Sequence, residues 1–354
     1  MKKQTTKDLH SRPRRLLREC CSTSMASLLF FLSLVFGFQF AKCLFLAVEI
    51  APLPSSPTPS TSSTNAEEFG SSLQWHSMSD EELMRRAAEM PPSDVERRRS
   101  GAAAKVAFMF LTRGRIPLRP LWERFFKGHT GLFSIYIHAS PEFNVEPPED
   151  SVFFKRRIPS KPVQWGRWSI LDAERRLLAN ALLDPSNQRF VLLSESCIPL
   201  FGFPTVYAYL LDSTLSFVSS FDDPRRAGRG RYNRLMHPTV ALADWRKGPQ
   251  WFELHRRLAA AIVADRRYYP LFREHCRSPC YLDEHYVPTL VTKLFPGLNA
   301  NRSVTWADWS RGGSHPATYN RGDVSVRLLQ RMRSGSKCAY SDNATTSTCF
   351  LFAR

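Results

Sequence analysis

The amino-acid sequence predicts an α/β domain with a mostly parallel sheet and helices on both of its faces. Short apolar runs of strand length recur at 105–113, 132–138, 190–194 and 215–219. Segments with apolar residues at helical spacing lie between them, at 118–126 and 174–183. Strands that alternate with helices favour a parallel sheet, because each crossover packs its helix back onto the sheet. Residues 104–354 are numerous enough to bury such a core as one domain.

Polar residues stand at the ends of three of these strands. His138 ends the second strand, Glu195 follows the third, and Asp222 follows the fourth. In open α/β sheets, ligands bind outside the carboxyl ends of the strands. We therefore expect these three residues to lie along the edge of the sheet where a substrate binds.

The residues before the domain are interpreted as a cytosolic head (1–24), a transmembrane signal anchor (25–48) and a Pro/Ser/Thr-rich stem (49–103). The head is basic, which keeps it in the cytosol by the positive-inside rule. The apolar run from Ala26 to Val48 would be about 34 Å long as a helix, enough to cross a hydrocarbon core of ~30 Å. A cleaved signal peptide is the alternative, although no good cleavage site follows the run. The domain is therefore expected on the luminal side of a membrane.

The chain is strongly basic. Its formal net charge is +17, and residues 104–354 contribute +15 of it, with 36 Lys and Arg against 21 Asp and Glu. A basic domain favours an anionic ligand or surface. The anchor argues against nucleic acid and for phosphorylated or acidic substrates in a secretory lumen. A basic surface that is merely well solvated is the other interpretation.

Cysteines and glycosylation motifs agree with a luminal domain. Five cysteines lie in it: Cys197, Cys276, Cys280, Cys338 and Cys349. An oxidising lumen would allow two disulfides and one free thiol, and Cys338 with Cys349 is the first pair expected. A possible zinc site is suggested by four residues close in sequence: His275, Cys276, Cys280 and His285. Their spacing differs from the paired spacing of known zinc ligands, so a disulfide or packed thiols are favoured instead. Sequons begin at Asn301 and Asn343.

Two acidic motifs could carry chemistry. Asp222 and Asp223 are adjacent before a proline, unlike the Asp-x-Asp that holds a divalent metal in many nucleotide-sugar transferases. We expect one aspartate of this pair to bind a substrate hydroxyl, or the pair to form part of a turn. Asp283 and Glu284 stand with His285 at the entry of a probable helix, where a carboxylate is held in its ionised form and suits a general base. An ordinary N-terminal capping cluster is the alternative.

Several segments together resemble a known family. They are Trp165-Gly166, the run 173–178, VLLSESCIPL at 191–200, SFVSSFDDP at 216–224, the run 228–232, KGPQWFELHRR at 247–257, YLDEHYVPTL at 281–290, VTWADWSRGGSHP at 304–316 and CFLFAR at 349–354. In this order they resemble the plant members of the core-2/I-branching β-1,6-N-acetylglucosaminyltransferase-like family, glycosyltransferase family 14. The resemblance covers the domain from about Lys105 to Arg354.

The resemblance implies a GT-A-like nucleotide-sugar transferase fold, anchored in the Golgi membrane as a single-pass type II protein. It implies inverting transfer from a UDP-sugar to a glycan acceptor on a cell-wall glycoprotein or polysaccharide, without a metal or other cofactor. Glu284 would be the catalytic base. Glu195, Arg229 and Arg231 would contact the acceptor, and fixed cations would stabilise the diphosphate. Trp165, Trp306 and Trp309 are candidates for stacking on sugar faces, or for packing in the core.

This chain departs from the family pattern at two places. The animal enzymes read the nucleotide with an aspartate after the second strand, where this sequence has His138-Ala139-Ser140. The family usually continues after CFLFAR with Lys-Phe, whose lysine binds the diphosphate. Arg354 is therefore expected to bind the diphosphate here, less well because of its own α-carboxylate, or the C-terminus is truncated. The alternative function is a Golgi glycan-binding or scaffold member of the same fold with weak or no catalysis.

Overall fold

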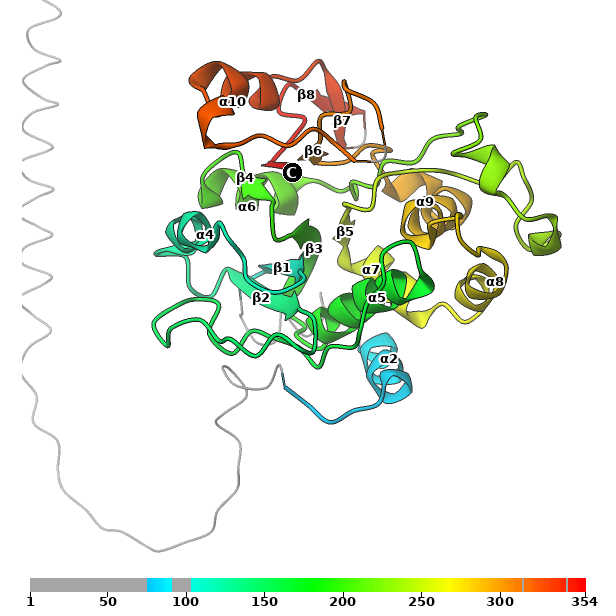
Figure 1. Ribbon diagram of the computed structural model, residues 1–354, viewed down its shortest axis with the longest axis horizontal. Helices are drawn as coiled ribbons and strands as arrows, with labels where there is room; N and C mark the ends of the chain where they lie inside the picture. Colours follow the sequence, from blue (N-terminus) through cyan, green and yellow to red (C-terminus); the bar gives the residue numbers. More distant parts are fainter. Residues whose placement is uncertain (1–74, 91–102, 314, 342) are drawn as a thin grey trace, which may run out of the picture. The chain divides into compact units, whose positions relative to one another are not determined.

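The computed structural model describes residues 75–90, 103–313, 315–341 and 343–354 (Figure 1). The predicted head, the predicted anchor at 25–48 and most of the predicted stem lie outside these ranges. Within the described ranges, no helix has both the length and the apolar character needed to cross a membrane. All of the described residues belong to one compact unit.

The main sheet has four strands in the order β2-β1-β3-β5. These are β1 (Lys105–Leu111), β2 (Phe133–His138), β3 (Asn187–Ser194) and β5 (Glu253–His255). The first three are parallel, and Leu111 pairs with both His138 and Ser194, so their carboxyl ends meet at one edge. β5 runs antiparallel to β3. The mixed α/β architecture agrees with the fold class expected from the sequence.

Helices cover both faces of this sheet, because the side chains of β1 alternate between two apolar cores. Phe108 and Phe110 pack with α4 (Arg119–Phe126) and α6 (Phe203–Asp212). Ala107 and Met109 face the opposite core. That core is built from α5 (Trp168–Leu182), α7 (Arg256–Ala264), α8 (Tyr268–His275) and α9 (Leu282–Leu294). Figure 1 shows the two helix layers on either side of the strands.

A helix from the predicted stem packs onto the domain. α2 (Asp80–Glu89) buries Leu83 and Ala87 in the same core as α5 and α7. Its first residue, Asp80, pairs with Arg176 of α5 at 2.7 Å and with Lys161 at 2.6 Å. Burial alone would raise the pKa of Asp80, but the hydrogen bonds and charges of these two cations lower it to about 2. This part of the segment assigned to the stem is therefore packed against the folded domain.

The C-terminal part adds a second, smaller sheet. Its order is β4-β9-β6, with β4 at Ile198–Pro199, β9 at Phe352–Ala353 and β6 at Thr305–Trp306. A hairpin of β7 (Cys338–Ser341) and β8 (Ala344–Thr346) and the helix α10 (Val326–Arg333) complete this region. Among the described residues there are also the short 3-10 helices η1 (Arg229–Arg231), η2 (Arg234–Met236), η3 (Pro296–Leu298) and η4 (Arg321–Asp323). Because β4 follows β3 directly, β9 brings the last residue, Arg354, near the end of β3 (Figure 1).

Two expectations from the sequence need correction. The apolar run 215–219 is buried but is no strand of the main sheet, since only single residues pair: Ser216 with Asn299 and Phe217 with Glu253. β5 takes the position beside β3 instead. The helix expected at 174–183 begins earlier, at Trp168.

Disulfides join Cys338 to Cys349, the first pair expected, and Cys276 to Cys280. Cys197 is a free, buried thiol.

Candidate active site

The carboxylate of Glu284 lies between two cations. It stands in the first turn of α9 and is partly exposed. Its Oε2 atom accepts a hydrogen bond from Nη1 of Arg231 at 2.6 Å, and Nζ of Lys247 donates to the same oxygen. Arg231 comes from η1 and Lys247 from the segment before β5. Three separate parts of the chain therefore meet at this carboxylate.

The backbone around Glu284 is fixed by a close approach at Gly248. The Gly248 N–H donates to the carbonyl of Glu284 at 2.9 Å. A Cβ atom at position 248 would lie 2.0 Å from the carbonyl oxygen of Ser219, far inside van der Waals contact. Only glycine allows the segment that carries Lys247 to pass this close to α9.

An aromatic wall flanks the same carboxylate. Tyr281 precedes α9 in a left-handed conformation, with φ of +59°. The guanidinium of Arg231 lies over the Tyr281 ring at 4.5 Å, and the ring of Trp165 lies 5.1 Å from it. Trp165 is 58% exposed. The exposed indole of Trp165 is thus connected to the candidate base by a chain of contacts through Tyr281 and Arg231.

His285 does not act at this surface. Its ring is fully buried and stacks on Trp245 with centroids 4.4 Å apart, while Nδ1 donates to the carbonyl of Arg246 at 2.7 Å. Burial lowers the pKa of His285 to about 4, so the ring is neutral at physiological pH. It is a packing residue within α9.

Near the end of β3 lie Arg354 and Glu195, two residues expected from the sequence to contact substrates. Arg354 places its guanidinium over the Trp251 ring at 4.7 Å, and its backbone N–H donates to the Trp306 carbonyl at 2.9 Å. Its Nε is buried and has no partner among the described residues. Burial raises the pKa of the nearby Cys197 thiol, on which the opposing charges of Arg354 and Glu195 also act. Glu195 and Arg354 therefore both lie close to the Cys197 thiol.

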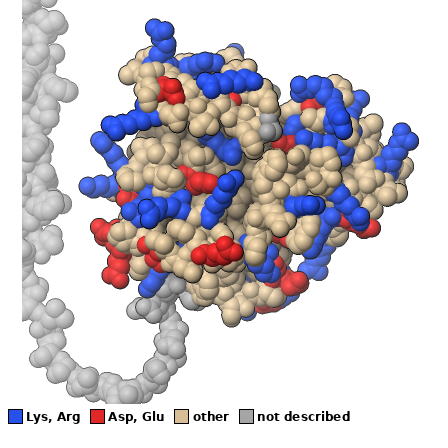
Figure 2. Space-filling model, in the orientation of Figure 1, with Lys and Arg blue, Asp and Glu red and all other residues tan. Residues whose placement is uncertain are grey.

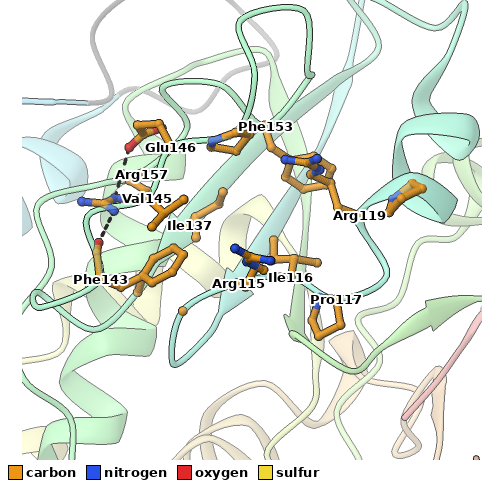
Figure 3. Close-up of a pocket in the computed structure, with 14 residues that line it drawn as sticks. Arg115, Ile116, Pro117, Arg119, Ile137, Phe143, Val145, Glu146, Phe153 and Arg157 are labelled. Carbon is orange, nitrogen blue, oxygen red and sulfur yellow. Dashed lines mark hydrogen bonds and ion pairs between the residues drawn. The ribbon is translucent and has the colours of Figure 1, made fainter.

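A cavity of ≈360 Å³ opens where β1 and β2 end. It is lined by the loops after these strands, including Arg115, Arg119, Phe143 and Arg157 (Figure 3). Arg157 donates to the Phe143 carbonyl and lies 3.5 Å from a carboxylate oxygen of Glu146. No motif in the sequence indicated this cavity, although arginines crowd both loops.

A family model described as core-2/I-branching enzyme matches residues 106–333, more than half of the chain. The chain belongs to the core-2/I-branching enzyme family. It is also 36% identical over 297 residues to "Glycosyltransferase BC10" of Oryza sativa subsp. japonica, covering 71% of this chain and 73% of that relative. The resemblance seen in the sequence motifs is thereby confirmed, and the family is one of glycosyltransferases.

The last residue of β2, His138, is buried. His138 is 1% exposed, and its Nε2 accepts from the Lys161 N–H at 3.3 Å. Burial and the charge of Arg176 lower the pKa of His138 to about 3. His138 is absent from the residues that line the cavity, whereas its neighbours Ile137 and Ala139 line it.

Other residues expected in the family's site stand apart from Glu284. Arg229 is exposed and pairs with Asp222, while the carboxylate of Asp223 binds Arg225 at 2.8 Å. Trp309 is 49% exposed in the loop after β6. Trp306 is half-buried and lies 6.0 Å from the Tyr319 ring. No described cluster of three His, Cys, Asp or Glu residues could hold a metal ion.

Basic side chains are widespread on the surface, and the asparagines of both sequons are exposed. Lysine and arginine side chains are spread over the whole face shown in Figure 2. Asn343 is exposed in the turn of the β7–β8 hairpin, and Thr345 is exposed beside it. Asn301 is also exposed, but its Oδ1 accepts from the Ser220 N–H at 3.1 Å and Ser303 of its sequon is buried.

Proposed function

We propose that this protein is a Golgi type II membrane glycosyltransferase that transfers a sugar from a UDP-sugar to a hydroxyl of a glycan acceptor. The observation that carries the proposal is Glu284, which stands in the first turn of α9 and is paired with two cations, Arg231 and Lys247, in a domain of the core-2/I-branching family. The donor sugar is N-acetylglucosamine or another sugar carried by UDP. The acceptor belongs to a cell-wall glycoprotein or polysaccharide.

The donor would lie along the carboxyl edge of the sheet. The cavity where β1 and β2 end is wide enough for a nucleoside and has arginines at its rim. From there the diphosphate would extend toward Arg354, whose unpaired, buried Nε suits an anionic oxygen. A buried, unpaired donor costs about 1–3 kcal/mol, and a phosphate oxygen would satisfy it. Fixed cations would thus neutralise the charge that builds on the leaving diphosphate.

The acceptor would lie on the other side of Glu284. A sugar ring would stack on the exposed face of Trp165, with a hydroxyl toward the carboxylate, and Arg231 would orient it. Both ion pairs of Glu284 use Oε2, so Oε1 is the oxygen that would take the hydroxyl proton.

The reaction would be a single displacement. The acceptor oxygen attacks the anomeric carbon while the bond from that carbon to the β-phosphate oxygen breaks. UDP leaves with the electron pair, and Glu284 takes the acceptor proton. One displacement inverts the anomeric configuration. Asp222 and Asp223 form ion pairs with different arginines, so no two free carboxylates remain at that position to bind one metal ion. This supports a metal-free mechanism.

The alternative is a glycan-binding member of the family with weak catalysis. The observation in its favour is the double ion pair at Glu284, since two cations already occupy one oxygen of that carboxylate. The surrounding aromatic and cationic side chains would serve binding as well as transfer.

The deciding experiment measures UDP release by the full-length chain in detergent, with a panel of UDP-sugars and plant glycan acceptors. We expect release that needs both substrates, survives a chelator, and falls by about 10²-fold or more in Glu284→Gln. Glu149→Gln, which removes an exposed carboxylate outside the site, should leave the rate unchanged. Acceptor binding without UDP release would establish the alternative, and loss of activity with chelator would contradict the metal-free mechanism.

A further inference from the structure

A second cavity lies beside α2, and we call it the α2 groove. Its volume is ≈840 Å³, within the range of sites that hold small ligands. Its lining residues come mostly from α2, α5, α8 and the end of α7 with the turn that follows (Figure 1). They include neither Glu284 nor its partners Arg231 and Lys247. The transfer reaction proposed above therefore leaves the α2 groove without a role.

An exposed aromatic ring belongs to the lining of the α2 groove. Trp168, the first residue of α5, is 44% exposed. The guanidinium of Arg273 on α8 lies over its indole ring, 4.2 Å from the ring centroid, and a cation held over the ring fixes its orientation. An oriented, exposed indole in a concave site gains free energy when a ligand covers it. The apolar C–H face of a sugar ring is such a ligand.

The rest of the lining offers hydrogen-bond donors and acceptors side by side. Basic and acidic side chains line the α2 groove in nearly equal number, so its charge does not select a polyanion. The carboxylate of Asp172 accepts from the Tyr269 hydroxyl, and the guanidinium of Arg175 lies over the Tyr269 ring at 3.7 Å. A sugar hydroxyl both donates and accepts, so it pairs with carboxylates and guanidiniums alike. Together with the indole, this lining suits a neutral glycan.

The α2 groove is connected to the candidate acceptor surface by two ring contacts. Trp165 stands three residues before Trp168 in the chain. The Trp165 ring lies 5.1 Å from the Tyr281 ring, and the Trp168 ring lies under Arg273. Tyr281 and Arg273 belong to one stretch of chain, from α8 to the start of α9. The loop before α5 therefore follows this stretch from the candidate site to the α2 groove.

We propose that the α2 groove is a second glycan-binding site, which holds an outer part of a polysaccharide acceptor while Glu284 acts on a sugar further along the same chain. The role of this glycan as the acceptor rests on the proposed transferase function, whereas the binding of a glycan to the groove does not. Two sites on one chain make the second binding event intramolecular, so a long acceptor binds more tightly than a short one.

Affinity electrophoresis of the full-length chain in a nonionic detergent measures glycan binding without a donor. The native gels contain arabinoxylan, galactan or polygalacturonate, and a gel without polysaccharide is the reference. We expect at least one of the two neutral polysaccharides to retard the parent, and Trp168→Ala to raise the Kd from these gels about tenfold. Trp168→Phe keeps an aromatic ring and should restore most of the retardation.

Arg327→Met is the control, because it removes an exposed arginine of α10 that does not line the α2 groove. It should bind as the parent does, whereas Arg273→Met should weaken binding. Three results would overturn the proposal: no retardation by a neutral polysaccharide, retardation by polygalacturonate alone, or equal retardation of the parent and Trp168→Ala.

Kinetics with acceptors of different length tests the link to transfer. The acceptors are oligosaccharides of increasing length, cut from the polysaccharide that retards the parent. In the parent, KM for the acceptor should fall about tenfold or more once the chain is long enough to reach the α2 groove. Trp168→Ala should lose most of this dependence of KM on length, and a dependence equal to that of the parent would contradict a role in acceptor binding.

Failure of this proposal and failure of the proposed function give different results. If Trp168→Ala loses glycan binding but the parent releases no UDP with any donor, the proposed function fails and the α2 groove remains a glycan site. If the parent transfers sugar with one KM for every acceptor length and binds glycans no better than Trp168→Ala, the transferase stands and the groove assignment fails.

Discussion

Nη1 of Arg231 lies 2.6 Å from Oε2 of Glu284, although the two residues are 53 positions apart in the chain. The guanidinium also covers the Tyr281 ring, so one side chain orients both the candidate base and the aromatic wall beside it. The loop that carries Arg231 therefore controls the geometry of the site as much as α9 does.

Replacement of Arg231 by methionine should lower kcat/KM for transfer about 10- to 100-fold, because the carboxylate of Glu284 loses one of its two fixed partners. The measurement is UDP release at varied acceptor concentration. Arg226→Met removes an exposed arginine from the same loop and should leave kcat/KM unchanged. Equal activity of Arg231→Met and the parent would show that Lys247 alone positions the base.

Asp283→Asn should make the protein more stable at neutral pH. The pKa of Asp283 is raised from 3.8 to about 6 in the folded state, so its stabilising contribution is present below pH 3.8 and is lost as the pH rises through about 6. Asparagine cannot ionise and avoids this loss. A shift of this size corresponds to a gain of up to about 3 kcal/mol in the free energy of unfolding at pH 7.

Denaturant unfolding of the parent and Asp283→Asn, repeated from pH 4 to pH 8, checks this expectation. The difference in the free energy of unfolding should grow as the pH rises from about 4 to about 6 and level off above pH 6. Two curves that stay parallel over this range would show that Asp283 titrates near its ordinary pKa.

Gly248→Ala should destabilise the protein by about 2 kcal/mol or more, since the added methyl group collides with the Ser219 carbonyl and pushes the Lys247 segment away from α9. It should also reduce transfer. Gly297→Ala is the matched control, because nothing lies within 4 Å of a Cβ there and the residue does not have a positive φ. Thermal unfolding of both variants measures the difference, and similar midpoints would contradict the close approach at Gly248.

Asn343→Gln should remove an N-linked glycan when the full-length chain is produced in a secretory host. The side chain is exposed in a hairpin turn, and its sequon threonine is exposed as well. The apparent mass on a gel, with and without glycosidase treatment, gives the result. Asn301→Gln is the comparison, and we expect a smaller effect because part of its sequon is buried. Absence of any glycan would argue against the luminal orientation.

Of the four strands of the main sheet, the sequence predicted the three that contain a continuous apolar run and missed β5, which does not. β1 lies buried between two cores and therefore shows an unbroken apolar run. β5 contains Glu253, which is fully buried through its ion pair with Arg189 at 2.7 Å, so its pattern resembles a loop. The run at 215–219 is apolar because it is buried, yet burial does not require continuous strand pairing.

The candidate site could also be predicted only in part. Motifs indicated Glu284 and Arg231, but a sequence gives no distances, so their ion pair was unexpected. Glu174 occupies a helix with ordinary apolar spacing, and only the folded structure shows that it is buried and accepts a hydrogen bond from Gln250. The cavity where β1 and β2 end is formed by two loops that meet only in the folded chain.

The packing of α2 on α5 sets where a soluble fragment of this chain can begin. Arg176 is 5% exposed and relies on Asp80 for its charge partner. A fragment cut at residue 104, where the sequence alone suggests that the domain starts, would leave that guanidinium unpaired and open the core at Leu83 and Ala87 to water. Removing one partner of a fully buried ion pair costs about 3–5 kcal/mol. The cost here is smaller because the Asp80 side chain is 31% exposed, but it is still a notable share of the stability of a typical domain. A fragment that keeps Asp80 and the rest of α2 avoids this loss.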